Sequence, residues 1–110
     1  MGKGQNPGEL ELTVMLALAS AERALASREV YEEIVARTGR DLAVASVHVT
    51  LNRLQAKRLV DAAMAPGPEG LGREVKHFAL NRRGVATLQE SRTYWEKLWG
   101  AARLQGRSGQ

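Results

Sequence analysis

Cysteine is absent from this sequence of 110 residues, so disulfide frameworks, thiolate zinc sites and cysteine nucleophiles are excluded. Histidine is scarce: His48 and His77 are the only two, and neither a serine–histidine–acid set nor a phosphate-binding glycine loop is visible. Long apolar runs are missing too, because the longest, residues 14–19, is far shorter than the ~20 residues of a membrane span. We therefore expect a protein that is not an enzyme, needs no cofactor or metal and does not enter a membrane.

Acidic residues are fewer than basic residues only in the later part of the chain. Residues 1–40 carry five Lys or Arg and six Asp or Glu, whereas residues 41–110 carry eleven and six. The formal net charge is +4. A basic C-terminal part favours a polyanionic partner, most simply double-stranded DNA, although such charge also serves solubility alone.

The chain is long enough for one domain, and its two ends are rich in Gly, Gln and Ser. We expect residues 1–5 and 106–110 to be flexible tails, since they have little to bury. A first helix is expected after Asn6 as N-cap, with Pro7 in the first helical position and Glu9 completing a capping box. This helix is apolar nearly all the way round, which predicts cover on several sides, including a second subunit.

Two further helices follow. Ser27 is expected to cap the second helix and Gly39 to end it in the left-handed conformation. The third helix is expected over residues 44–57, with a buried stripe at spacings of three, four and three. That stripe consists of Val44, Val47, Leu51 and Leu54.

The opposite face of the third helix contains no acidic residue. At 100° per residue it centres on Ser46, Val49 and Arg53, with Asn52 and Lys57 flanking it and His48 nearer its edge. A small, polar and basic helix face suits the major groove of DNA, although it is also compatible with an ordinary solvated surface. We assign base contacts to Ser46, Asn52 and Arg53, with His48 and Val49 as further candidates, and a phosphate contact to Lys57.

Residues 59–65 and 73–80 are expected to form two strands around a Pro- and Gly-rich loop, which predicts a β-hairpin. Three helices followed by a hairpin with a basic second strand is the order of a winged helix-turn-helix domain. In that arrangement the hairpin, or wing, contacts the DNA backbone. Arg73 and Lys76 are therefore predicted phosphate contacts.

The last helix is expected to begin after Asn81 as N-cap and to run to about Leu104. Its length of roughly 35 Å exceeds what so small a body can cover, and two Trp side chains lie on its apolar seam. A homodimer would cover them. The predicted interface residues are Leu12, Met15, Leu16, Leu88, Trp95 and Trp99.

Three segments in order resemble PadR-type transcriptional regulators. Residues 9–19 resemble their first helix, residues 46–54 with Leu59-Val60 their recognition helix, and residues 72–84 their wing strand and the start of their last helix. The chain departs from the pattern by carrying His48-Val49 for Tyr-Pro, Arg58 for Gly, and Ser27-Arg28 for Gly-Tyr. The short single C-terminal helix is similar to that of the small subfamily.

The fold expected is therefore mainly α with a small β-hairpin: a winged helix-turn-helix domain over residues 6–80 and a C-terminal dimerisation helix over residues 81–105. The resemblance implies a homodimeric repressor, which would act in the cytoplasm, and the two recognition helices of a dimer would bind a roughly palindromic operator. In some relatives aromatic residues at the dimer interface hold a small planar hydrophobic effector. Trp95 and Trp99, four residues apart, are the candidates for such a site here, although these rings also suit a plain dimer core. The alternative function is a winged helix used for protein–protein contact without an operator.

Overall fold

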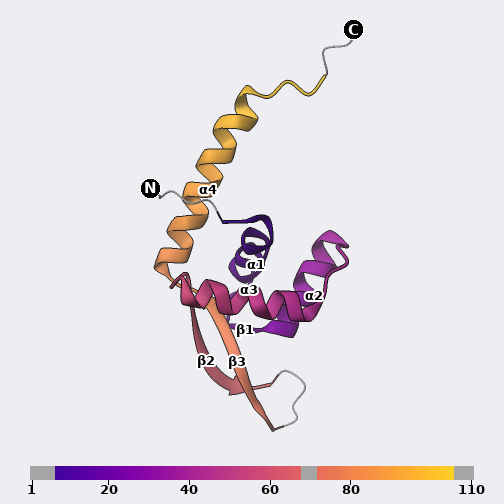
Figure 1. Ribbon diagram of the computed structural model, residues 1–110, viewed down its shortest axis with the longest axis vertical. Coiled ribbons are helices and arrows are strands. Elements are labelled where there is room, and N and C mark those ends of the chain that lie inside the picture. Colours follow the sequence, from indigo (N-terminus) through magenta and orange to yellow (C-terminus); the bar gives the residue numbers. More distant parts are fainter. Residues whose placement is uncertain (1–6, 68–71, 106–110) are drawn as a thin grey trace.

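The computed structural model describes residues 7–67 and 72–105, and the expected tails at residues 1–5 and 106–110 lie outside this part (Figure 1). The elements follow the expected order, with one short strand added. They are α1 (Glu9–Ala19), β1 (Leu25–Ala26), α2 (Ser27–Thr38), α3 (Val44–Ala56), β2 (Val60–Pro66), β3 (Glu74–Leu80) and α4 (Arg82–Ala101).

The start of α1 differs from the expectation. The helix begins at Glu9 with Gly8 as N-cap, so Pro7 precedes the helix and does not take its first position, and the expected cap Asn6 lies outside the described residues. Glu11, the third helical residue, accepts a hydrogen bond on Oε1 from the Gly8 N–H at 3.4 Å. A carboxylate at this position satisfies a free backbone donor and also suits the positive end of the helix dipole.

The start of α2 is also capped by a carboxylate at the third helical position, and the helix begins one residue earlier than expected. Ala26 is the N-cap and Ser27 is already helical. Glu29 accepts the Ala26 N–H at 3.0 Å, so a carboxylate replaces the predicted hydroxyl cap. The end of α2 confirms the prediction, because Gly39 adopts φ 67° and its N–H donates to the Val35 carbonyl at 2.8 Å.

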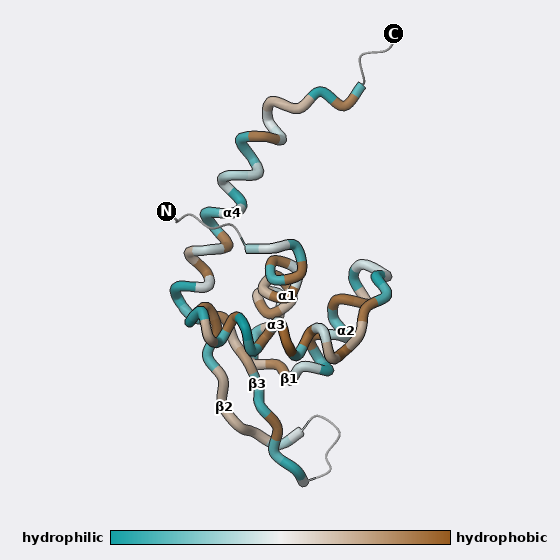
Figure 2. The backbone as a smooth tube through the Cα atoms, in the orientation of Figure 1, coloured by the Kyte–Doolittle hydropathy of each residue, from teal (hydrophilic) through white to brown (hydrophobic). Residues whose placement is uncertain are grey.

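The core lies where α1, α2 and α3 meet the sheet. The stripe on α3 is confirmed for Val47, Leu51 and Leu54, which are fully buried, whereas Val44 at the start of the helix is half-buried. Phe78 of β3 is also fully buried and completes this core. In Figure 2 the apolar segments of α1 and α3 lie within this central body, where burial of apolar surface stabilises the fold.

The sheet has three antiparallel strands in the order β1–β3–β2. The β2–β3 hairpin is the predicted wing, in register from Val60 opposite Leu80 to Pro66 opposite Glu74. The third strand, β1, was not expected: its Leu25 pairs with Phe78 at the root of the wing. This pairing ties the segment between α1 and α2 to the wing.

The last helix extends away from the body. Asn81 is the N-cap, as predicted, and its Oδ1 accepts the Gly84 N–H at 2.9 Å. The helix ends at Ala101, three residues before the expected Leu104. The molecule measures 61 × 32 × 22 Å, and α4 and the wing extend from opposite ends of the body (Figure 1).

Candidate nucleic-acid interface

The outer face of α3 is exposed, as the helical periodicity requires. Ser46 and Arg53 are exposed, and the Val49 side chain is 53% exposed. The stripe behind them is held rigidly by the core, so these three side chains have a fixed spacing. An exposed helix face with a cation, a hydroxyl and an apolar side chain can contact phosphates, base acceptors and thymine methyl groups.

His48 is held by its own molecule. Its Nδ1 lies 2.7 Å from Oγ of Ser27 at the start of α2, and its ring meets Phe78 edge to face at 6.5 Å. The ring therefore helps to join α3 to α2. It remains exposed on one side, beside the predicted contact face.

Lys57 follows the last residue of α3 and forms an ion pair with a residue of α1. Its Nζ donates to Oε2 of Glu11 at 2.8 Å, and Glu11 is only 9% exposed. A buried carboxylate without a cation would be costly, so this ion pair joins the start of α1 to the end of α3. A phosphate contact by Lys57 would have to share the ammonium with Glu11.

Lys76 points from the wing toward α3. Its Nζ donates to Oδ1 of Asn52 at 2.9 Å and to Oε1 of Gln55 at 3.0 Å. The ammonium also lies 5.5 Å from the centroid of the Phe78 ring. Two of its three donors are thus used within the protein. Arg73, just before β3, is exposed.

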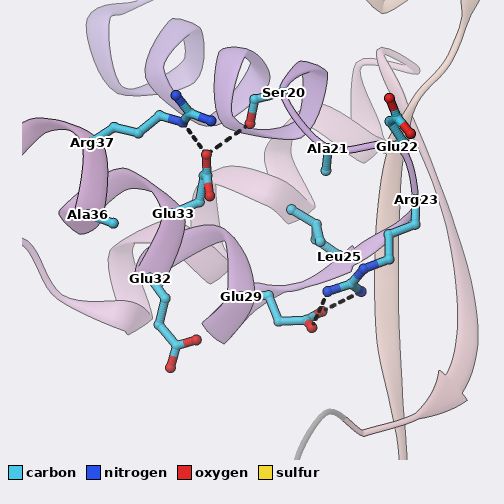
Figure 3. A pocket seen from close by; sticks show the side chains of 10 residues that line it. All are labelled: Ser20, Ala21, Glu22, Arg23, Leu25, Glu29, Glu32, Glu33, Ala36 and Arg37. Carbon is cyan, nitrogen blue, oxygen red and sulfur yellow. Dashed lines mark hydrogen bonds and ion pairs between the residues drawn. The ribbon is translucent and has the colours of Figure 1, made fainter.

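A polar groove lies between the end of α1 and the outer side of α2 (Figure 3). Arg23 forms an ion pair with Glu29 at 2.8 Å, and this hydrogen bond holds the pKa of Glu29 below its usual value. Hydrogen bonds from Arg37 and then from Ser20 lower the pKa of Glu33 in the same way. Paired, charged carboxylates line this groove, so it does not suit a DNA phosphate.

A second groove, of about 540 Å³, lies between α1 and α4 and is largely apolar. Of the predicted interface residues, Leu16 is 52%, Trp95 45% and Trp99 63% exposed, while Leu12 and Leu88 are half-buried. Met15 is a correction: it is fully buried in the core of its own protomer and is not available to a partner. Its side chain packs with core residues of α2 and α3 and does not line the groove.

The described residues contain no cluster of three His, Asp or Glu side chains placed to hold a metal ion. Across the same residues, no helix combines the length and apolar character needed to cross a membrane.

Sequence reasoning missed the interactions that connect the elements. Gln55 and Glu11 were not recognised as partners of Lys76 and Lys57. One signal was present: in a strand, residues two apart share a face, so Lys76 had to lie on the same side of β3 as the apolar Phe78. This side of β3 faces α3, where Lys76 finds its partners. A side chain that contacts only DNA would be expected to point away from the protein.

Comparison with known proteins adds a family and a fold. The family model described as penicillinase repressor matches residues 7–102. Among curated proteins, no sequence matches this chain.

Several solved structures share the fold at low sequence identity. A PadR-like transcriptional regulator from Bacillus cereus has a TM-score of 0.71 and 18% identity, with 89% of this chain and 93% of that chain covered. A winged-helix DNA-binding protein from STIV has a TM-score of 0.67 and 16% identity, over 84% and 92% of the two chains. BpsR from Bordetella bronchiseptica, described with the regulation of its DNA binding by 6-hydroxynicotinic acid, has a TM-score of 0.67 and 17% identity, over 94% and 70%. The resemblance to PadR-type regulators is thus confirmed at the level of the fold.

Proposed function

Because this chain belongs to the penicillinase repressor family, we propose that it is a transcriptional repressor that binds a palindromic DNA operator as a homodimer. The observation that carries the proposal is the outer face of α3, where Ser46, Val49 and Arg53 are exposed and no acid intervenes. In a winged-helix dimer, two such helices enter successive major grooves about one helical turn apart. The protein would act where the DNA is, in the cytoplasm.

We assign each side chain a DNA contact according to the polar or apolar groups that it does not already use within the protein. Arg53 is assigned to a guanine, whose O6 and N7 match its paired donors, and Val49 to a thymine methyl group. Arg73 is assigned to a phosphate beside the wing. Ser46 is assigned to a base edge. His48 and Lys57 would have to exchange or share their present partners, Ser27 and Glu11, in order to contact DNA.

The second subunit is proposed to cover α4. Trp95, Leu98 and Trp99 are each about half exposed or more, on a helix that extends past the body. Adjoining apolar side chains of this size mark an interaction site on a soluble protein. A second copy of α4, together with the groove beside α1, would bury them and set the distance between the two α3 helices.

The α1–α4 groove also suits an effector, in keeping with the small-molecule regulation described for BpsR. Its volume of about 540 Å³ is that of a small-molecule site, and Trp95 provides an aromatic wall. Arg92, at its edge, pairs with Glu96 at 2.9 Å and could exchange that partner for an anionic effector. A planar effector would relieve repression by favouring a dimer geometry in which the α3 helices no longer match the groove spacing. Because Trp95 and Trp99 are the only two Trp residues, binding is measured by calorimetry: a heat of binding for planar phenolic acids that is lost in the double variant Trp95→Ala/Trp99→Ala would support this site.

DNA binding is tested by selecting duplexes from a random pool and titrating the best one at several salt concentrations. We expect affinity to fall steeply with salt, because each neutralised phosphate releases condensed counterions. Arg53→Ala should cost about 1–3 kcal/mol on the selected duplex and relax preference at one base position.

The matched control is Arg37→Ala, which removes the same charge from the polar groove on α2 and should leave DNA affinity unchanged. Failure of the wild-type protein to bind any duplex in a salt-dependent way would contradict the proposal. It would favour the alternative, a winged helix that contacts another protein through apolar surface.

A further inference from the structure

The link between the wing and α3 is specific in its chemistry. Lys76 of β3 donates one hydrogen bond to Asn52 and one to Gln55, which lie three residues apart on the same side of α3. All three side chains are half-buried, and Phe78 lies beneath the ammonium. We call this arrangement the Lys76 clasp.

The clasp determines which way both amide groups point. An ammonium has three donors and no acceptor, so only the amide oxygens of Asn52 and Gln55 can face Lys76. The amide NH₂ groups must then point away from Lys76. Turning either amide over would place NH₂ against the ammonium and leave a half-buried charge without its partner, which is costly.

Asn52 occupies a sensitive place on α3. It flanks the outer face, 100° around the helix from Arg53, on the side where the wing lies. A free Asn reads adenine by accepting from N6 and donating to N7 at once. With its oxygen facing the Lys76 ammonium, the Asn52 amide is held in one orientation and its NH₂ is turned away from Lys76.

We propose that Lys76 is a positioning residue that determines base specificity, by holding the Asn52 oxygen toward the wing so that the amide meets DNA through its NH₂ donors. This inference rests on the proposed DNA-binding function. An amide that meets a base through its NH₂ selects edges that offer acceptors, which are O6 and N7 of guanine or O4 of thymine. It disfavours the paired contact to adenine, which needs the oxygen and the NH₂ to face the same base. The clasp also joins the wing to α3, so Arg73 and the base-reading face move as one body.

The specificity test compares base preference in Lys76→Met and in Arg73→Met, by selection from a random duplex pool and titration at several salt concentrations. Methionine keeps the apolar stem of Lys76 against Phe78 and removes only the ammonium. In Lys76→Met the amide can turn over. We expect preference at the position read by Asn52 to change by about tenfold, with adenine gained, and the salt dependence to stay as in wild type.

Arg73→Met is the matched control, since it removes one cation from the same wing. It should weaken binding to all duplexes about equally and reduce the salt slope by about one for each subunit. If Lys76→Met behaves like Arg73→Met, with unchanged base preference and a reduced salt slope, Lys76 is a phosphate contact and the proposal is overturned.

The clasp itself is tested without DNA by a double-mutant cycle on the unfolding equilibrium. Lys76→Met is measured in the wild-type protein and in Asn52→Ala/Gln55→Ala. We expect coupling of about fivefold or more in the unfolding constant, as two hydrogen bonds to a charged group imply. Additive effects would show that the clasp does not form. If coupling is found but the wild-type protein binds no duplex, the proposed function and the specificity role of Lys76 are both wrong. The clasp would then be only a structural link between the wing and α3.

Discussion

Arg58 is the one residue other than glycine with a positive φ, 64°, in the part of the chain that the structure describes. It follows α3 in a Schellman motif, in which the Arg58 N–H donates to Gln55 and the Leu59 N–H to Leu54. Glycine is the usual residue here, because a Cβ makes the left-handed conformation unfavourable by about 1–2 kcal/mol. PadR-type regulators, to which the sequence is similar, usually carry Gly at this position.

Arg58→Gly is expected to stabilise the protein by about 0.5–1 kcal/mol. The relief of backbone strain exceeds the extra entropy that glycine has in the unfolded chain. Chemical denaturation measures the change. Arg58→Ala is the control, since it removes the charge but keeps the Cβ. Equal stability of the Gly and Ala variants would mean that charge, not backbone strain, governs this position.

At the scale of elements, α4 is anchored by close approach of its first turn to the junction of α3 and β2. A Cβ on Gly84 would lie 2.2 Å from the Leu59 carbonyl oxygen and 2.9 Å from Leu80 Cδ2. Asn81, the N-cap, adds a hydrogen bond from Nδ2 to the Arg58 carbonyl at 3.0 Å. The direction in which α4 leaves the body therefore depends on the absence of a side chain at residue 84.

Gly84→Ala should destabilise the protein by about 1–3 kcal/mol, because the overlap with backbone cannot be relieved by a side-chain rotation. This cost opposes the gain of about 1 kcal/mol that Ala brings to a helix interior. Gly100→Ala, in the same helix, is the control: nothing lies within 4 Å of its Cβ, so only the gain remains. Thermal unfolding should shift in opposite directions for the two variants. A stabilised Gly84→Ala would contradict the close packing.

At the scale of the whole molecule, the two ends have different chemistry. The wing and the outer face of α3 carry Arg53 and Arg73, whereas the far half of α4 exposes aromatic and aliphatic side chains. Tyr94 and Trp95 pack edge to face at 5.1 Å, which leaves at least one face of each ring for other contacts. This separation suits the proposed function, in which a second subunit binds at one end and DNA at the other.

Replacing Trp95 and Trp99 together by Ala should raise the dimer dissociation constant by several orders of magnitude. Truncating a large buried aromatic costs about 3–5 kcal/mol where it is fully packed. Sedimentation at micromolar concentration measures the result. Met64→Ala, which removes an exposed apolar side chain from the wing, should leave dimerisation unchanged. A wild-type protein that is monomeric under these conditions would rule out the dimer.

The features that the sequence alone determined are those set by neighbours along the chain. The buried stripe of α3, the left-handed Gly39, the Asn81 cap and the antiparallel hairpin each depend on a few consecutive residues and the periodicity of the backbone. The outer face of α3 followed from the same periodicity.

Only the tertiary structure decided which side chains on that frame remain free. Lys76 lies 24 residues from Asn52, and Lys57 lies 46 residues from Glu11, so no local pattern reveals these partners. Strand β1 has two residues and exists only because β3 offers it an edge. The burial of Met15 could not be predicted from the sequence either, because a helix that is apolar on all sides gives no sign of which side faces the core. Packing of distant segments, with the need to pair each buried donor and charge, settles these choices.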